Sequence, residues 1–167
     1  MFRAEWEPRL GKICTFFGHR FVPDEKKVAQ YALKVIRDLI INDNVTEFWC
    51  GGYGNFDALT GSIVKKLQKE YPHIKISRVL AYMPKHKEDI EYLEKIYDNV
   101  FLPDGVELGL PRYGIIERNR YMAQTADVCV CYVKWDGGAR KAMNIALKYN
   151  KKVINLADLL NIEIDKF

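Results

Sequence analysis

The chain has no long apolar run. Its 167 residues are 49% hydrophobic, but no uninterrupted apolar stretch approaches the ~18 residues that a membrane-spanning helix needs. The N-terminal segment 1–10 contains Glu5, Glu7 and Pro8 and has no apolar core of the kind found in secretory signal peptides. The sequence therefore predicts no membrane partner and, taken as it stands, a cytoplasmic protein.

The sequence also lacks paired cysteines. None of its four cysteines, Cys14, Cys50, Cys129 and Cys131, belongs to a C-x-x-C motif, and all of them fall within apolar runs. Cysteines in such runs usually act as small hydrophobic residues of the core. We therefore expect free thiols in a reducing compartment, with no disulfide, no metal site and no nucleophilic cysteine.

Blocks of like charge are absent as well. Lysine and arginine number 26 and aspartate and glutamate 22, which gives a net charge of +4. The lysines fall on the polar faces of predicted helices, whereas a protein that binds a polyanion usually shows a basic stripe. The charge pattern disfavours nucleic acid as a partner and is compatible with an anion of the size of a nucleotide.

Strand-like and helix-like patterns alternate along the whole sequence. Apolar runs typical of buried strands alternate with segments whose apolar residues recur at helical spacing. We predict strands at 13–17, 47–50, 74–83, 100–102, 128–133 and 152–156. Helices are predicted after residue 24, after the turn at 51–55, and at 85–95, 113–123 and 138–149, with a loop at 103–111 and a tail at 159–167. This order predicts a single α/β domain over 1–167, with a Rossmann-like, doubly wound, mainly parallel sheet of about six strands and helices on both faces.

Two glycine turns, each between an apolar run and a helical segment, are the most informative motifs. The first consists of Gly51, Gly52, Tyr53, Gly54 and Asn55, with Asp57 shortly after it. The second consists of Asp136, Gly137, Gly138, Ala139 and Arg140. A helix that starts directly after such a turn presents free backbone amides and the positive end of its dipole, and glycine lets an anion approach them closely. The two turns predict a binding site for the phosphate of a nucleotide or nucleotide-derived ligand. Because the spacing is not G-x-G-x-x-G, standard dinucleotide binding is disfavoured.

A third candidate segment, Gly18, His19 and Arg20, follows the first predicted strand. A guanidinium and a titrating imidazole at that position suit the recognition of phosphate or carboxylate, and a polar surface turn is the alternative. The carboxyl ends of parallel strands meet at one edge of a sheet, so we expect this segment and both glycine turns to converge on one rim.

Several other side chains have two interpretations each. Asp57 and Asp136 either cap the helices that follow them or contact the ligand, Asp136 through a ribose hydroxyl. Arg140 opposes the dipole of its own helix, which a nearby anion would relieve. The aromatic residues that either stack on a base or belong to the core are Tyr53, Tyr82, Tyr113 and Trp135.

Four segments together carry a resemblance to a known family. They are residues 15–20, 51–57, 118–122 (with Ala126 and Asp127 just beyond) and 137–139, and they resemble the DUF1273-like (YpsA-like) proteins of the SLOG superfamily. The resemblance runs from about Lys12 to about Leu156. It implies a Rossmann-like fold that binds or senses a nucleotide-type ligand at its glycine loops, and it selects Arg118 over Arg120 as the arginine that faces the ligand. SLOG-type domains often pair, so the resemblance also implies a homo-oligomer.

One departure from this superfamily bears on catalysis. The LOG phosphoribohydrolases carry the motif P-G-G-x-G-T-x-x-E, which, aligned on Gly137 and Gly138, places the catalytic glutamate at Asn144. An amide cannot stabilise the cationic ribosyl centre formed during N-glycosidic hydrolysis. The resemblance therefore favours binding over catalysis. One alternative is a nucleoside-phosphate or NAD-type N-glycosidase that uses Asp57 or Glu117. The other is single-stranded nucleic-acid binding, as in DprA, for which the scattered lysines form no contiguous basic groove.

Overall fold

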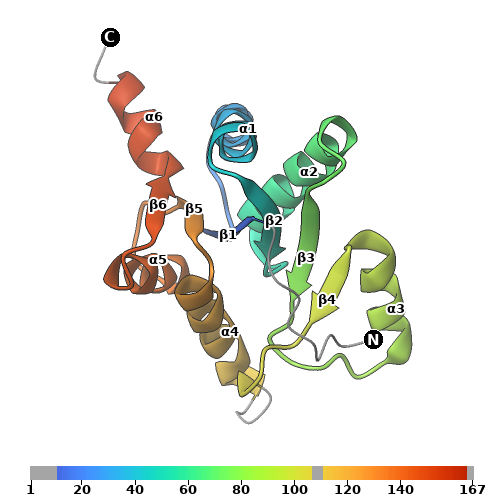
Figure 1. Ribbon diagram of the computed structural model, residues 1–167. Helices are drawn as coiled ribbons and strands as arrows, with labels where there is room; N and C mark the ends of the chain where they lie inside the picture. The colour runs from blue at the N-terminus through green and yellow to red at the C-terminus, as the bar shows by residue number, and fades with distance from the viewer. Residues whose placement is uncertain (1–10, 107–110, 165–167) are drawn as a thin grey trace.

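The computed structural model describes residues 11–106 and 111–164 of the chain. Within them, six parallel strands form one sheet in the order β4-β3-β2-β1-β5-β6 (Figure 1). The strands are β1 (Lys12–Gly18), β2 (Val45–Cys50), β3 (Lys75–Val79), β4 (Asn99–Phe101), β5 (Val128–Tyr132) and β6 (Lys152–Asn155). The helices are α1 (Glu25–Asn42), α2 (Gly54–Glu70), α3 (Lys87–Ile96), α4 (Pro111–Thr125), α5 (Gly138–Lys148) and α6 (Leu156–Ile164). The predicted Rossmann-like, doubly wound architecture is confirmed.

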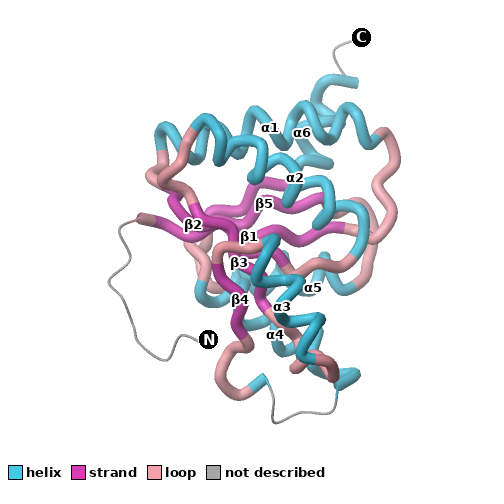
Figure 2. The backbone as a smooth tube through the Cα atoms, turned by 90° about the vertical axis from the view of Figure 1, so that its right-hand side faces the viewer, coloured by secondary structure: helices cyan, strands magenta, loops and turns pink. Residues whose placement is uncertain are grey.

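Helices cover the sheet on both sides. Figure 2 shows α1, α2 and α6 above the sheet and α4 and α5 below it, and Tyr97 at the end of α3 packs against the same apolar cluster as α1 and α2. Because the strands are covered on both faces, most of their side chains are apolar in both directions, and β5 is buried at every position. One apolar cluster lies between the sheet and α1, α2 and α6, and a second lies between the sheet and α4 and α5. The sheet therefore gives a rigid base for the loops at its edge.

The helix α1 illustrates how the sequence pattern produces this packing. Its buried residues, Val28, Ala32, Ile36, Leu39 and Ile40, recur at intervals of three or four and so form one stripe along the helix. That stripe joins the first apolar cluster, while the charged residues lie on the opposite side. Burial of each large aliphatic side chain in such a stripe contributes roughly 1.5–3 kcal/mol.

Strand order reverses next to β1. The chain first adds β2, β3 and β4 on one side of β1 and then crosses through α4 to place β5 on the other side, where Cys14 of β1 lies opposite Val128. In open α/β sheets the loops diverge at such a reversal and leave a crevice beyond the carboxyl ends of the two strands. The loops after β1 and β5 carry two of the three predicted ligand-binding segments.

The predicted long strand at 74–83 is wrong in length, since β3 ends at Val79. Its neighbour β4 has three residues, and the last backbone bond between the two segments runs from the amide of Leu80 to the carbonyl of Phe101. Beyond that point the chain leaves the sheet and passes against α4, where the carbonyl oxygen of Ala81 lies 2.3 Å from the position of a Cβ on Gly114. The strand therefore stops where its hydrogen-bond partner stops.

The predicted tail at 159–167 is also wrong as far as it is described. Residues 156–164 form the helix α6, which follows β6 directly, and only 165–167 lie outside the described residues. The side-chain oxygen of Asn155 accepts a hydrogen bond from the amide of Ala157 (3.3 Å), which satisfies a first-turn donor of the helix. Leu156, Ala157 and Leu160 are buried against the first apolar cluster. Two other predicted segments lie outside the described residues: the segment 1–10, for which no signal sequence is expected, and residues 107–110 of the expected loop.

All four cysteines are buried and free, with exposed fractions of 0–1%. Burial raises the pKa of each thiol, that of Cys129 to about 12. Such thiols stay protonated near neutral pH and are weak nucleophiles. In the part of the chain that the structure describes, no helix is long and apolar enough to cross a membrane.

Candidate functional site

A cleft of about 470 Å³ opens beyond the carboxyl ends of β1, β2 and β5, beside α4. It brings together residues from all three predicted ligand-binding segments and from α4. The predicted residues that line it are Gly18, His19, Arg20, Gly51, Tyr53, Asp57, Arg118, Trp135, Asp136, Gly137, Gly138 and Ala139. The candidates that do not line it are Gly52, Gly54, Asn55, Tyr82, Tyr113, Glu117 and Arg140. The two glycine turns thus lie on the same side of the molecule.

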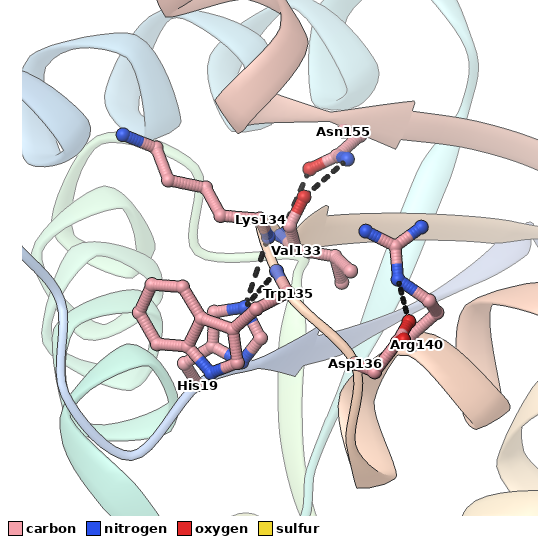
Figure 3. A network of polar contacts seen from close by, with 7 residues as sticks. All are labelled: His19, Val133, Lys134, Trp135, Asp136, Arg140 and Asn155. Atoms are coloured by element: carbon pink, nitrogen blue, oxygen red, sulfur yellow. Dashed lines mark hydrogen bonds and ion pairs between the residues drawn. The ribbon is translucent and has the colours of Figure 1, made fainter.

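His19 anchors the loop after β5 to the end of β1. Its Nε2 accepts hydrogen bonds from the amides of Lys134 (2.9 Å) and Trp135 (3.4 Å), so the ring is neutral and carries its proton on Nδ1. The indole of Trp135 stacks on the imidazole with ring centroids 3.8 Å apart (Figure 3). The ring is 7% exposed. His19 therefore positions the second glycine turn, a structural task that its residue type alone did not indicate.

The start of α5 is open to the cleft. Gly137 adopts φ 156° and ψ −164°, a conformation available mainly to glycine, and no side chain caps the helix. The first backbone bond of the helix runs from the amide of Lys141 to the carbonyl of Gly137, so the amides of Gly138 and Ala139 precede it and have no partner within the helix. No atom lies within 4 Å of a Cβ placed on either glycine, neighbouring residues aside. This helix start has the free donors and the space that an anion needs.

The start of α2 differs, because its amides are already used. The carboxylate of Asp57 accepts a hydrogen bond from the amide of Tyr53 (2.9 Å), and the carbonyl of Arg20 accepts one from the amide of Asn55 (2.9 Å). Gly54 has φ 81°, and a Cβ there would lie 2.6 Å from the Cα of Arg20. The first glycine turn is thus built for close packing against the loop after β1, and these two amides are not available to a phosphate.

Arg118 holds the first glycine turn from the side of α4. It is 3% exposed, its Nη1 donates to the carbonyls of Gly51 (2.7 Å) and Val79 (3.4 Å), and its Nε donates to the side-chain oxygen of Asn119 (3.1 Å). Burial lowers its pKa, which the negative charge of Asp57 opposes. Arg120, two residues along, is exposed and faces Glu117 at 3.9 Å. Of the two arginines, Arg118 is the one that lines the cleft, but most of its donors are engaged within the protein.

Asp57 is the acid at the floor of the cleft. Its Oδ1 is covered and has no hydrogen-bond partner. Burial raises the pKa of this carboxyl, against the effects of the Tyr53 amide bond and of the nearby positive charges of Arg118 and Arg78. Of the two candidate acids for N-glycosidic chemistry, only Asp57 faces the cleft. Asn144, at the position of the LOG glutamate, is exposed and lies outside the cleft lining.

Sequence reasoning missed several residues around the site. Phe21 and Ile115 line the cleft, and no motif distinguishes them from ordinary apolar residues. Arg78 lies behind the first glycine turn, with its Nη1 1.1 Å from the position that a Cβ on Gly52 would take. The available signal for Arg78 was a single arginine within the otherwise apolar end of a predicted buried strand. Within the described ranges, no three His, Cys, Asp or Glu side chains gather closely enough to hold a metal ion.

We expect the stability of the protein to fall as the pH is lowered from about 7.5 to about 5, in part through His19. Burial, and secondarily the positive charge of Arg140, lowers the pKa of His19 in the folded state, whereas an unfolded histidine titrates at about 6.5. Between these two pKa values only the unfolded chain binds the proton, so the free energy of unfolding decreases with falling pH and levels off below the folded pKa. Urea unfolding across this range measures the effect.

The variant His19→Asn should show a shallower pH dependence than the wild type, because the titrating group is gone. The exposed His86 supplies the control, since His86→Asn leaves the contribution of His19 in place. Equal slopes for His19→Asn and the wild type would contradict the assignment.

The fold and the cleft together define an α/β protein of the Rossmann-like class, with its cleft at the point of strand reversal. Comparison of the chain with protein-family models and with curated protein sequences gives no match.

Proposed function

We propose that this protein binds a nucleotide or nucleotide-derived small ligand in the cleft, with a phosphate of the ligand at the start of α5. The observation that carries the proposal is the uncapped helix start at Gly137 and Gly138, which faces the cleft with free amides and open space. Amides at a helix N-terminus, together with the helix dipole, favour an anion there. Arg20, which is exposed and lines the same cleft, provides a positive charge across from this helix start.

The rest of the cleft suits the other parts of a nucleotide. Its volume of about 470 Å³ lies within the range of roughly 300–1,000 Å³ that is usual for small-molecule sites. The indole of Trp135 is 45% exposed above the imidazole of His19 and offers a flat surface for a base. Asp136 forms an ion pair with Arg140 (3.0 Å), yet its side chain is 98% exposed and free to turn towards a ribose hydroxyl. Binding or sensing fits these features better than hydrolysis.

A negative charge introduced at Gly138 tests the proposal. We expect Gly138→Asp to weaken nucleotide binding at least tenfold, because a carboxylate at the helix start occupies the phosphate position and repels the ligand. The side chain has room, and φ of Gly138 is not positive, so the variant should fold and be at least as stable as the wild type. Titration calorimetry with a panel of nucleoside phosphates, ADP-ribose and NAD measures the affinities.

The neutral variant Gly138→Asn is the matched control, since it has nearly the same size and no charge. It should lose much less affinity than Gly138→Asp. If no member of the panel binds to the wild-type protein, the proposal is overturned. If the two variants lose affinity equally, the phosphate does not bind at this helix start.

A further inference from the structure

A second cavity, of about 350 Å³, lies on the other side of Tyr53 from the cleft. It opens between the end of β3 and the start of α3, and Tyr53 lines both spaces. The hydroxyl groups of Tyr53 and Tyr82 are hydrogen-bonded at 2.6 Å. We call this space the Arg78 cavity, after the charged side chain that enters it from the sheet. Besides Arg78 and the two tyrosines, the charged or titratable residues that line it are Lys85, His86 and Asp89.

Arg78 is held in an unusual environment for a cation. Its guanidinium packs against the backbone of Gly52, near the rings of Tyr53 (6.0 Å to the centroid) and Tyr97 (5.9 Å). Gly52 has φ 77°, and a side chain there would occupy the space of the guanidinium. The turn is therefore shaped to admit the arginine. Its Nε is covered and has no hydrogen-bond partner, which is costly for a donor on a charged group.

The local charges do not balance. Among the described residues, no carboxylate lies within ion-pair distance of Arg78. The negative charge of Asp57 acts on Arg78, and it also acts on Arg118. The two guanidinium groups thus share one carboxyl. At the mouth of the cavity, Lys85 adds a positive charge, and Asp89 is the acid that opposes it. A half-buried cation with this surplus of positive charge is stabilised when an anion binds next to it.

We propose that the Arg78 cavity is a second binding site, which takes an oxyanion of the phosphate or carboxylate type on a small molecule. A guanidinium presents paired donors that match the oxygens of either group. Lys85 contributes at the mouth of the cavity, and Tyr53 separates the bound group from the cleft. This site does not depend on the ligand proposed for the cleft, because its cation, its opening and most of its lining residues are different.

The Nε–H signals of the arginines in a nitrogen–proton NMR spectrum test this site directly. We expect added inorganic phosphate to shift the signal of Arg78 in a saturable way, with sodium chloride at equal ionic strength as the reference. The Nε of Arg118, which is bonded to Asn119, is an internal control in the cleft and should move less. A parallel titration with malonate separates phosphate from carboxylate as the preferred group. Saturable binding of either one supports the proposal.

Two variants complete the experiment. Arg78→Met should reduce the affinity for the preferred anion at least tenfold, whereas Arg37→Met, on the exposed surface of α1 opposite Glu70, should leave it unchanged. If Arg78→Met does not fold, Lys85→Met at an exposed position should still weaken binding about threefold. No saturable shift at Arg78 with either anion, or the same shift with chloride, would overturn the proposal. Nucleotide binding at the start of α5 would be unaffected by that result.

Discussion

Arg118→Met is expected to lower the free energy of unfolding by about 3 kcal/mol, the size typical for removal of one partner from a buried, hydrogen-bonded charge. Arg118 is 3% exposed and donates to the carbonyl of Gly51 at 2.7 Å. Methionine fills similar space but leaves that carbonyl without its donor and removes one of the two positive charges that act on Asp57. Urea unfolding followed by circular dichroism measures the change.

Arg120→Met is the matched control on the same helix. Arg120 is about half exposed and faces Glu117 at 3.9 Å, and removal of such a surface pair changes stability by about 0.5 kcal/mol or less. The loss in Arg118→Met should also shrink towards acidic pH, because Asp57 becomes protonated and no longer needs a positive neighbour. A loss as small as that of the control would show that Arg118 does not hold the first glycine turn.

Gly18→Ala is expected to destabilise the protein by about 2 kcal/mol, as overpacking of a filled core usually does. A Cβ on Gly18 would lie 2.2 Å from the ring of Phe56. That ring is fully buried and packs on Tyr132 with centroids 6.1 Å apart, so it has no free space to move into. Thermal unfolding of the variant and the wild type gives the difference.

Gly61→Ala should have the opposite sign, although it makes the same chemical change on the helix that carries Phe56. No atom lies within 4 Å of a Cβ on Gly61, and alanine in a helix interior is favoured over glycine by about 0.5–1 kcal/mol. If Gly18→Ala were as stable as Gly61→Ala, the close contact between β1 and α2 would have to be looser than the structure shows.

The elements that sequence predicted well are those whose pattern is local. The stripe of α1 and the apolar runs of β1 and β5 need only their own residues to be recognised, because helix and strand periodicity is a property of one segment. The predicted strand at 74–83 failed, since its end depends on the length of β4, which is distant in sequence. The tail was wrong for a similar reason, because α6 is buried by contacts with other elements.

The candidate site shows the same division. Both glycine turns could be recognised because glycine between a strand and a helix indicates a tight turn from the local sequence alone. The sequence did not predict that the amides of the first turn are engaged and those of the second are open. The amides of the first turn are bonded to Asp57 and to the backbone of Arg20, which is distant in sequence. The sequence did not single out Arg78 as a candidate site residue. Its environment is formed by Gly52, Tyr53 and Tyr97, which only the fold brings next to it.

The sequence by itself determined the class of fold and the edge of the sheet, at the carboxyl ends of the strands, where the candidate residues gather. Both follow from apolar periodicity and from the positions of glycine and charged residues next to strand ends. The tertiary structure decided which helix start remains open and which of the charged groups remains available. Those outcomes depend on hydrogen bonds and packing between residues far apart in the chain, such as that of His19 with Lys134 or Arg118 with Gly51, and no local pattern encodes them.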